Sequence, residues 1–216
     1  LQALEKNTAL GSGYNISMND LEIRGAGSLF GHKQSGHISS VGFQMYCDLL
    51  NLELKKDKDG KNQQPVVKTT IPAEIEERYI EDPSFRIDYY YRISCVKTLE
   101  EVSNIEKELV GTFGDIPPKT KHLLLFSRIR VLFAPTPATK VVVQGRFIEV
   151  YLEDMGDSLD FFLQSIPLFA HDALLEIKLF PESQNCLKVV LYMSGVNNLF
   201  SLLLSFVRLF DGGKLN

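Results

Sequence analysis

The chain has 216 residues, of which 44% are hydrophobic and 23% charged, and its formal net charge is −4. These values are ordinary for a globular protein and allow one or two domains with a buried core. No apolar run approaches the roughly 20 residues that cross a bilayer, so we expect no membrane segment. The first eight residues are mixed in character and do not indicate a secretory signal peptide.

The distribution of charge and the spacing of the cysteines indicate which kinds of binding site to expect. Residues 1–64 hold 7 Lys and Arg against 7 Asp and Glu, whereas residues 65–216 hold 16 against 20. The acidic second part disfavours nucleic-acid binding there, so any DNA contact is expected in the first part. Cys47, Cys95 and Cys186 are widely spaced and odd in number. We therefore expect no disulfide framework or zinc site, interpret the three as small buried apolar residues, and predict a cytoplasmic location.

The first part of the chain contains few elements. A helix end is predicted at Gln2–Asn7 and a strand at Tyr14–Leu21, where apolar residues alternate. A glycine-rich stretch follows, and Val41–Leu54 then has the apolar spacing of an amphipathic helix that needs a partner surface. The polar run 51–64 indicates a frayed helix end or a linker. So small a part cannot bury much surface, and we interpret it as the end of a larger domain.

The second part predicts an α+β domain, in which three helices precede a β-β-α-β-β-α pattern. Thr98 and Glu101 form a capping box, and Pro117-Pro118 opens the next helix. A hairpin is expected around Gly145-Arg146. The predicted elements are an extended strip at 66–72, helices at 84–96, 98–110 and 118–133, two strands within 140–152, a short helix at 159–165, two strands within 174–193 around 181–185, and a largely buried final helix at 197–210.

The stretch LEIRGAGSLFGHKQSGH, residues 21–37, holds four glycines beside one arginine, Arg24. It lacks the lysine and hydroxyl spacing of a Walker A loop and has one residue too many for a dinucleotide fingerprint. Arg24 could pair with a nearby carboxylate in a structural role, or it could bridge moving parts or reach a phosphate. The four histidines have no metal-ligand spacing, and no nucleophile–base pattern stands out. Tyr89-Tyr90-Tyr91 fits a core or domain contact better than base stacking.

Residues 11–50 closely resemble the end of the motor module in the bacterial transcription-repair coupling factor (Mfd) family, and their core DLEIRGAGxLxGxxQSG is similar to the RecG translocases. In both families this is the TRG motif, beside the second RecA-like lobe. Residues 71–118 resemble the C-terminal domain of the coupling factors, which RecG is expected to lack. Within them, Glu76 and Glu81 stand where that family often has proline.

The resemblance implies a coupling element that converts ATP-driven motion into steps along double-stranded DNA. Arg24 and Gln34 would be its main contacts, because an arginine fork can break and remake bidentate pairs. The glycines would permit hinge motion. The implied site comprises Arg24, Gly25, Gly27, Gly31, Gln34, Ser35 and Gly36. No ATPase motif is seen, so this chain alone should be inactive and without a cofactor; ATP and Mg²⁺ would bind elsewhere in the parent protein.

The resemblance also implies a division of the chain: residues 1–56 as the TRG segment, 57–70 as a linker and 71–216 as the terminal domain. That domain would dock within the parent and mask the region that recruits excision repair. The parent would displace stalled RNA polymerase and bind UvrA, both through its other domains. A stand-alone protein-interaction module without a motor is the alternative interpretation.

Overall fold

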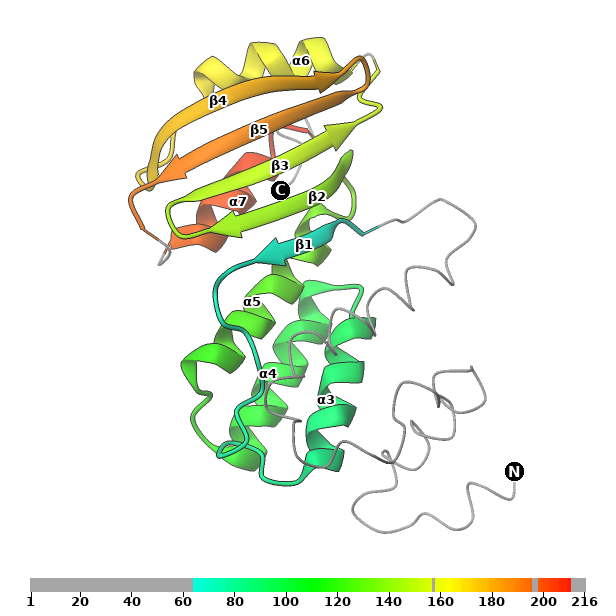
Figure 1. The fold of residues 1–216 in the computed structure, drawn as a ribbon, viewed down its shortest axis with the longest axis vertical. Coiled ribbons are helices and arrows are strands. Elements are labelled where there is room, and N and C mark those ends of the chain that lie inside the picture. Colours follow the sequence, from blue (N-terminus) through cyan, green and yellow to red (C-terminus); the bar gives the residue numbers. More distant parts are fainter. Residues whose placement is uncertain (1–63, 157, 196–197, 211–216) are drawn as a thin grey trace, which may run out of the picture.

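The strands are built from runs in which every second residue is aliphatic, so that one face of the sheet is apolar. The computed structural model describes residues 64–156, 158–195 and 198–210, and these contain a five-stranded sheet in the order β1-β2-β3-β5-β4 (Figure 1). The strands are β1 (Val66–Thr69), β2 (Ala138–Gln144), β3 (Phe147–Glu153), β4 (Leu174–Ser183) and β5 (Cys186–Met193). Only β1 pairs in parallel, with β2.

Both expected hairpins are present. Gly145 has φ +50° in the two-residue turn between β2 and β3, a conformation that suits glycine. The second turn is shorter than the predicted 181–185, because β4 continues to Ser183. Pro181 is tolerated there since β4 is an edge strand and the register shifts between Pro181 and Ser183.

The helices match the expected pattern closely. They are α3 (Pro83–Cys95), α4 (Leu99–Phe113), α5 (Pro118–Phe133), α6 (Ser158–Ser165), the 3₁₀ turn η2 (Ile166–Leu168) and α7 (Leu199–Val207). The capping box forms as predicted, with Glu101 N donating to Thr98 Oγ1 over 3.1 Å. Helix α4 continues past the predicted end at 110, through Gly111, to Phe113, and its C-cap Gly114 has φ +81°. The final helix ends at Val207 rather than at 210, and the last residues form tighter turns.

One apolar core joins the sheet to the helices. In Figure 1, helix α7 and the upper end of α5 lie behind the sheet. The rest of α5 forms a bundle with α3 and α4 below the sheet. The inward side chains of β2, β3 and β5 are buried, as are most residues of α5 and α7. Tyr89 and Tyr90 are also buried in this core, which confirms the interpretation of the tyrosine run.

The other face of the sheet carries rings and lysines. The Lys140 ammonium lies 3.5 Å from the centroid of the Tyr151 ring, and the Lys178 ammonium lies 4.9 Å from that of Tyr192. Such pairs let lysine stems cover a partly exposed aromatic ring. This face is therefore amphipathic, unlike the aliphatic face that packs on α5 and α7.

Some of the other predictions from the sequence are confirmed, some are corrected, and some concern residues that the structure does not describe. The α+β class and the order of three helices followed by β-β-α-β-β-α are confirmed. Cys95 and Cys186 are half-buried, not fully buried as expected, and neither is in a disulfide. Residues 66–69, within the predicted linker, form β1. The expected elements at 2–7, 14–21 and 41–54 lie outside the described residues, as does Cys47.

The Thr98 cap can be tested directly. We expect Thr98→Ala to lower the free energy of unfolding by about 1 kcal/mol, because the first turn of α4 loses an acceptor. A urea titration of the folded chain measures the change. Ser103→Ala is the control, since Ser103 Oγ donates only to the Leu99 carbonyl of its own helix. Equal losses in the two variants would contradict a stabilising cap.

Candidate functional site

The predicted coupling residues Arg24, Gly25, Gly27, Gly31, Gln34, Ser35 and Gly36 lie outside the described residues, so their role stays a prediction. Within the described residues, the most elaborate polar arrangement surrounds residues 71–82, which we call the strap. The strap contains neither helix nor strand and runs from the end of β1 to the start of α3 (Figure 1).

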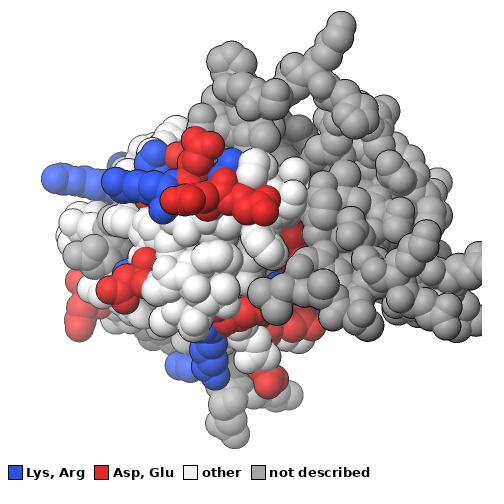
Figure 2. All heavy atoms as spheres, turned by 90° about the horizontal axis from the view of Figure 1, so that it is seen from below, with Lys and Arg blue, Asp and Glu red and all other residues white. Residues whose placement is uncertain are grey.

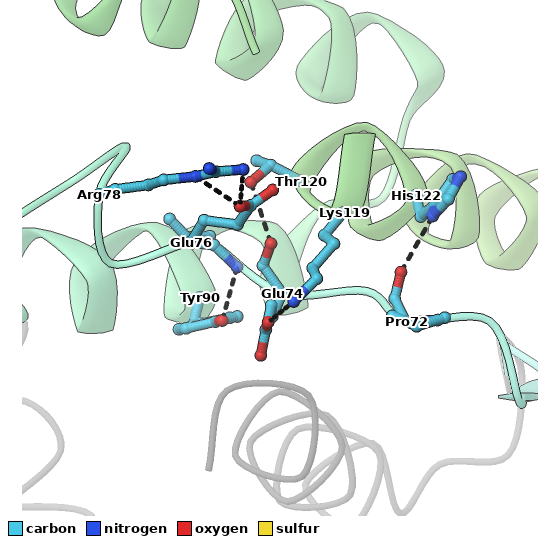
Figure 3. Close-up of polar contacts among 9 residues, drawn as sticks. Pro72, Glu74, Glu76, Arg78, Tyr90, Lys119, Thr120 and His122 are labelled. Atoms are coloured by element: carbon cyan, nitrogen blue, oxygen red, sulfur yellow. Dashed lines mark hydrogen bonds and ion pairs between the residues drawn. The ribbon is translucent and has the colours of Figure 1, made fainter. Parts of the chain in front are cut away.

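Helix α5 holds the middle of the strap at Glu74. Lys119 Nζ donates to Glu74 Oε1 over 2.6 Å, and Thr120 Oγ1 donates to the Glu74 carbonyl over 2.9 Å (Figure 3). The Glu74 carboxylate raises the pKa of Lys119. Thr120 is fully buried, so its hydroxyl needs a partner inside the protein. The start of α5 thereby fixes both the backbone and the side chain of Glu74.

Two further contacts hold the strap on either side of Glu74. The buried Tyr90 hydroxyl, on α3, accepts from Ile75 N over 2.7 Å. Burial raises the pKa of Tyr90, so the phenol stays neutral. His122 Nδ1 lies 2.9 Å from the Pro72 carbonyl (Figure 3). Two different helices therefore hold the backbone of residues 72–75.

The far end of the strap is held by Arg86, which is only 2% exposed. Its NH1 donates to the Ile80 carbonyl over 2.6 Å and to the Glu81 carbonyl over 2.9 Å. Its NH2 lies 3.5 Å from a Glu77 carboxylate oxygen. Tyr79 also reaches α4, because its hydroxyl donates to the Leu109 carbonyl over 3.1 Å. The strap is thus fixed to all three helices of the bundle.

The strap presents charged groups around an open hollow of about 500 Å³. The hollow is lined by Glu74, Glu76, Glu77, Arg78, Glu81 and Lys119. Arg78 pairs with Glu76 at 2.8 Å. Figure 2, which views the molecule from below, shows carboxylates beside basic side chains rather than a surface of one sign. An open and charged hollow of this kind does not suit enclosure of a small ligand, because such sites are concave and mostly apolar.

A second cluster joins α3 to α4. Glu108 Oε1 accepts from Tyr89 Oη over 2.9 Å and from Arg92 NH1 over 2.8 Å, and Arg92 NH2 bonds the other carboxylate oxygen. The Arg92 guanidinium holds the pKa of Glu108 below its usual range. Burial, reinforced by the bond to Glu108, raises the pKa of Tyr89 to about 12. The bidentate geometry locks the two helices side by side.

Sequence patterns did not point to these anchors. Lys119, Thr120 and His122 lie near the start of α5 and form no recognisable motif, and their partners are 45 to 50 residues away in sequence. Only the tyrosine run gave a signal, since a buried tyrosine hydroxyl generally finds a partner. Among the described residues, no group of three or more His, Cys, Asp or Glu is placed to hold a metal. None of the helices in that part of the chain is long and apolar enough to span a membrane.

This chain is similar in sequence to a known domain family and to several curated proteins. The family model described as the TRCF domain matches residues 69–159. The transcription-repair-coupling factor of Haemophilus influenzae is 36% identical over 159 residues, which cover 69% of this chain and 14% of that protein. The chain belongs to the transcription-repair-coupling factor family. The member from Bacillus subtilis is 38% identical over 135 residues, and the one from Borreliella burgdorferi is 32% identical over 171.

The structural comparison agrees at the level of fold. A crystal structure of the C-terminal domain of transcription-repair coupling factor superposes with a TM-score of 0.56 and 16% identity, and the match covers 70% of this chain and 94% of that one. The chain spans only 12% to 14% of the length of the three coupling factors named above. The TRCF domain matched by the family model includes the whole strap and all three helices that hold it.

Tyr90→Phe tests the anchoring of the strap. We expect a loss of about 1 to 2 kcal/mol in unfolding free energy, because the buried Ile75 N–H loses its acceptor. Amide exchange at residues 74–76 should also accelerate. Tyr192→Phe, on the half-exposed sheet face, is the matched control. If both variants behave alike in urea titration and exchange, Tyr90 does not anchor the strap.

The Glu108–Arg92 pair should make stability pH-dependent. The folded pKa of Glu108 is lowered, so the pair stabilises the fold above the unfolded pKa, about 4.3, and loses this effect as pH falls through the folded pKa. Arg92→Gln should cost less than about 1 kcal/mol at pH 7, since the pair is partly exposed. The deficit should shrink below about pH 4. Arg146→Gln, at the exposed hairpin turn, should show no such pH dependence in urea titrations.

Proposed function

We propose that this chain supplies two parts of a longer, ATP-dependent translocase of double-stranded DNA that acts in transcription-coupled repair. The observation that carries the proposal is the TRCF domain match over residues 69–159, in a chain whose preceding residues resemble the TRG motif. The first part couples ATP hydrolysis to movement. The second is a docking domain that restrains the parent protein.

In the coupling part, Arg24 and Gln34 make contacts that are remade as the motor lobes rotate. An arginine fork suits this role because its paired hydrogen bonds are directional and can be exchanged between partners. Gly25, Gly27 and Gly31 give the loop the backbone freedom that such motion requires. ATP and Mg²⁺ bind to motor lobes beyond this chain and supply the energy of the steps.

The docking part covers the region of the parent that recruits nucleotide excision repair and so delays binding of UvrA until RNA polymerase has been engaged. Its net acidic charge favours contact with a protein over contact with DNA. The strap supports this role, because its many anchors present the charged surface of the hollow in one fixed geometry. We place the whole protein in the cytoplasm, where its substrates are found.

The test uses the longer protein with two separate variants. Arg24→Ala should leave ATP hydrolysis substantial while displacement of a stalled RNA polymerase falls at least tenfold, because energy release and movement become uncoupled. Removal of residues 71–216 should instead increase UvrA binding. Gly11→Ala, outside the predicted coupling contacts, is the control for the first variant.

Each arm can fail by itself. If Arg24→Ala displaces stalled RNA polymerase as well as the unchanged protein does, the proposed coupling role is wrong, while the docking role is not affected. Unchanged UvrA affinity after removal of the domain would remove the docking role. If the longer protein shows neither effect, a simple interaction module without a motor connection becomes the better interpretation.

A further inference from the structure

Strand β1 is the shorter of the two edge strands and is held more weakly than the central strands β2, β3 and β5. It has four residues, and within the described part of the chain it pairs with β2 alone. Val67 is its one buried side chain, while Val66 is 37% exposed and Lys68 is also exposed. By contrast, its neighbour β2 is paired on both sides and buries Val141 and Val143 completely. Strands with few buried contacts open at lower free energy than the core.

The strap marks where this weak attachment ends. Directly after β1, the turn has a local hydrogen bond, which Ile71 N donates to Thr69 Oγ1 over 2.9 Å. From Pro72 onward the backbone is fixed by His122, Thr120 and Tyr90, as described above. Local unfolding of β1 should therefore end at Pro72. Beyond that residue, several buried or charged contacts would have to break before the strap could detach.

The other end of β1 is also lightly attached. Gln64 Nε2 donates to the Val96 carbonyl over 3.3 Å, and Arg130 NH2 approaches the same oxygen at 3.4 Å. The stronger bonds of Arg130 go to the Ser94 and Ile93 carbonyls, at 2.7 and 3.0 Å. If the Gln64 contact were lost, the Val96 carbonyl would still accept from Arg130, so no buried acceptor would be left without a hydrogen bond.

From this asymmetry we propose that β1 is a releasable strand, which lengthens the tether between the docking domain and the preceding segment without unfolding the domain. The use of that tether rests on the proposed function, in which the domain must dock and undock. Release frees residues 64–70, whose contour is roughly 23 to 25 Å when extended. The domain can then move away from the motor while its core and strap stay intact.

The experiment compares Val67→Ala with Val141→Ala in the 216-residue chain. The two valines are partners in the β1–β2 register and lie on the same buried face, so each variant removes the same two methyl groups. Amide hydrogen exchange followed by NMR reports each strand separately, and a urea titration reports global unfolding. Neither measurement needs the motor, so its outcome is independent of the tests of the proposed function.

We expect the amides of residues 66–69 to exchange at least tenfold faster than those of β3 in the unchanged protein. Val67→Ala should accelerate them by about a further tenfold and lower the urea midpoint less than Val141→Ala does, because a released β1 leaves the rest of the sheet folded. The amides of residues 74–80 should keep their exchange rates. Val141→Ala should lower the midpoint and accelerate exchange throughout the sheet. Equal protection of β1 and β3, or a midpoint that falls as far with Val67→Ala as with Val141→Ala, overturns the proposal. Faster exchange of the strap in Val67→Ala does so as well.

Discussion

Burial of α5 is the constraint on which the described structure depends. Ten of its 16 residues are buried, so it has no broad solvent face and needs cover on almost every side. The sheet and α7 cover one end, and α3, α4 and the strap cover the other. Three of its buried residues are polar, and each has a specific partner: Thr120 bonds the strap, Ser127 its own helix, and Arg130 the end of α3. These bonds fix which segments can cover the helix.

This arrangement explains why an irregular segment can present a reliable surface. The strap has no ladder or helix of its own to satisfy its backbone, so the protein supplies partners from three helices. A surface held in this way needs little further ordering when it contacts a partner, so the ordering cost of such a contact is small. Glu76 and Glu81 line the hollow and add negative charge to this rigid frame.

Local patterns in the sequence were sufficient for most elements of the domain. Each of three local patterns has a direct geometric reason to start or turn an element: the capping box at Thr98, the proline pair at the start of α5 and the glycine at 145. The helix starts and the turn are found where these patterns predict them. The limits of β4 and α7 were less predictable, because an edge strand can include Pro181 and a buried helix can end in tight turns. The strap anchors could not be predicted, since Lys119 and Glu74 are 45 residues apart and only the folded helices bring them together.

Arg130 also governs the order in which the helical layer can be completed. The carbonyls at the end of α3 are satisfied by a side chain 34 to 37 residues later in the chain. While the protein emerges from the ribosome, α3 and α4 can form turns, but the end of α3 stays without its guanidinium until most of α5 has been synthesised. The three helices must therefore fold together, and a nascent chain that stops before residue 130 would expose polar backbone and apolar surface at the same place.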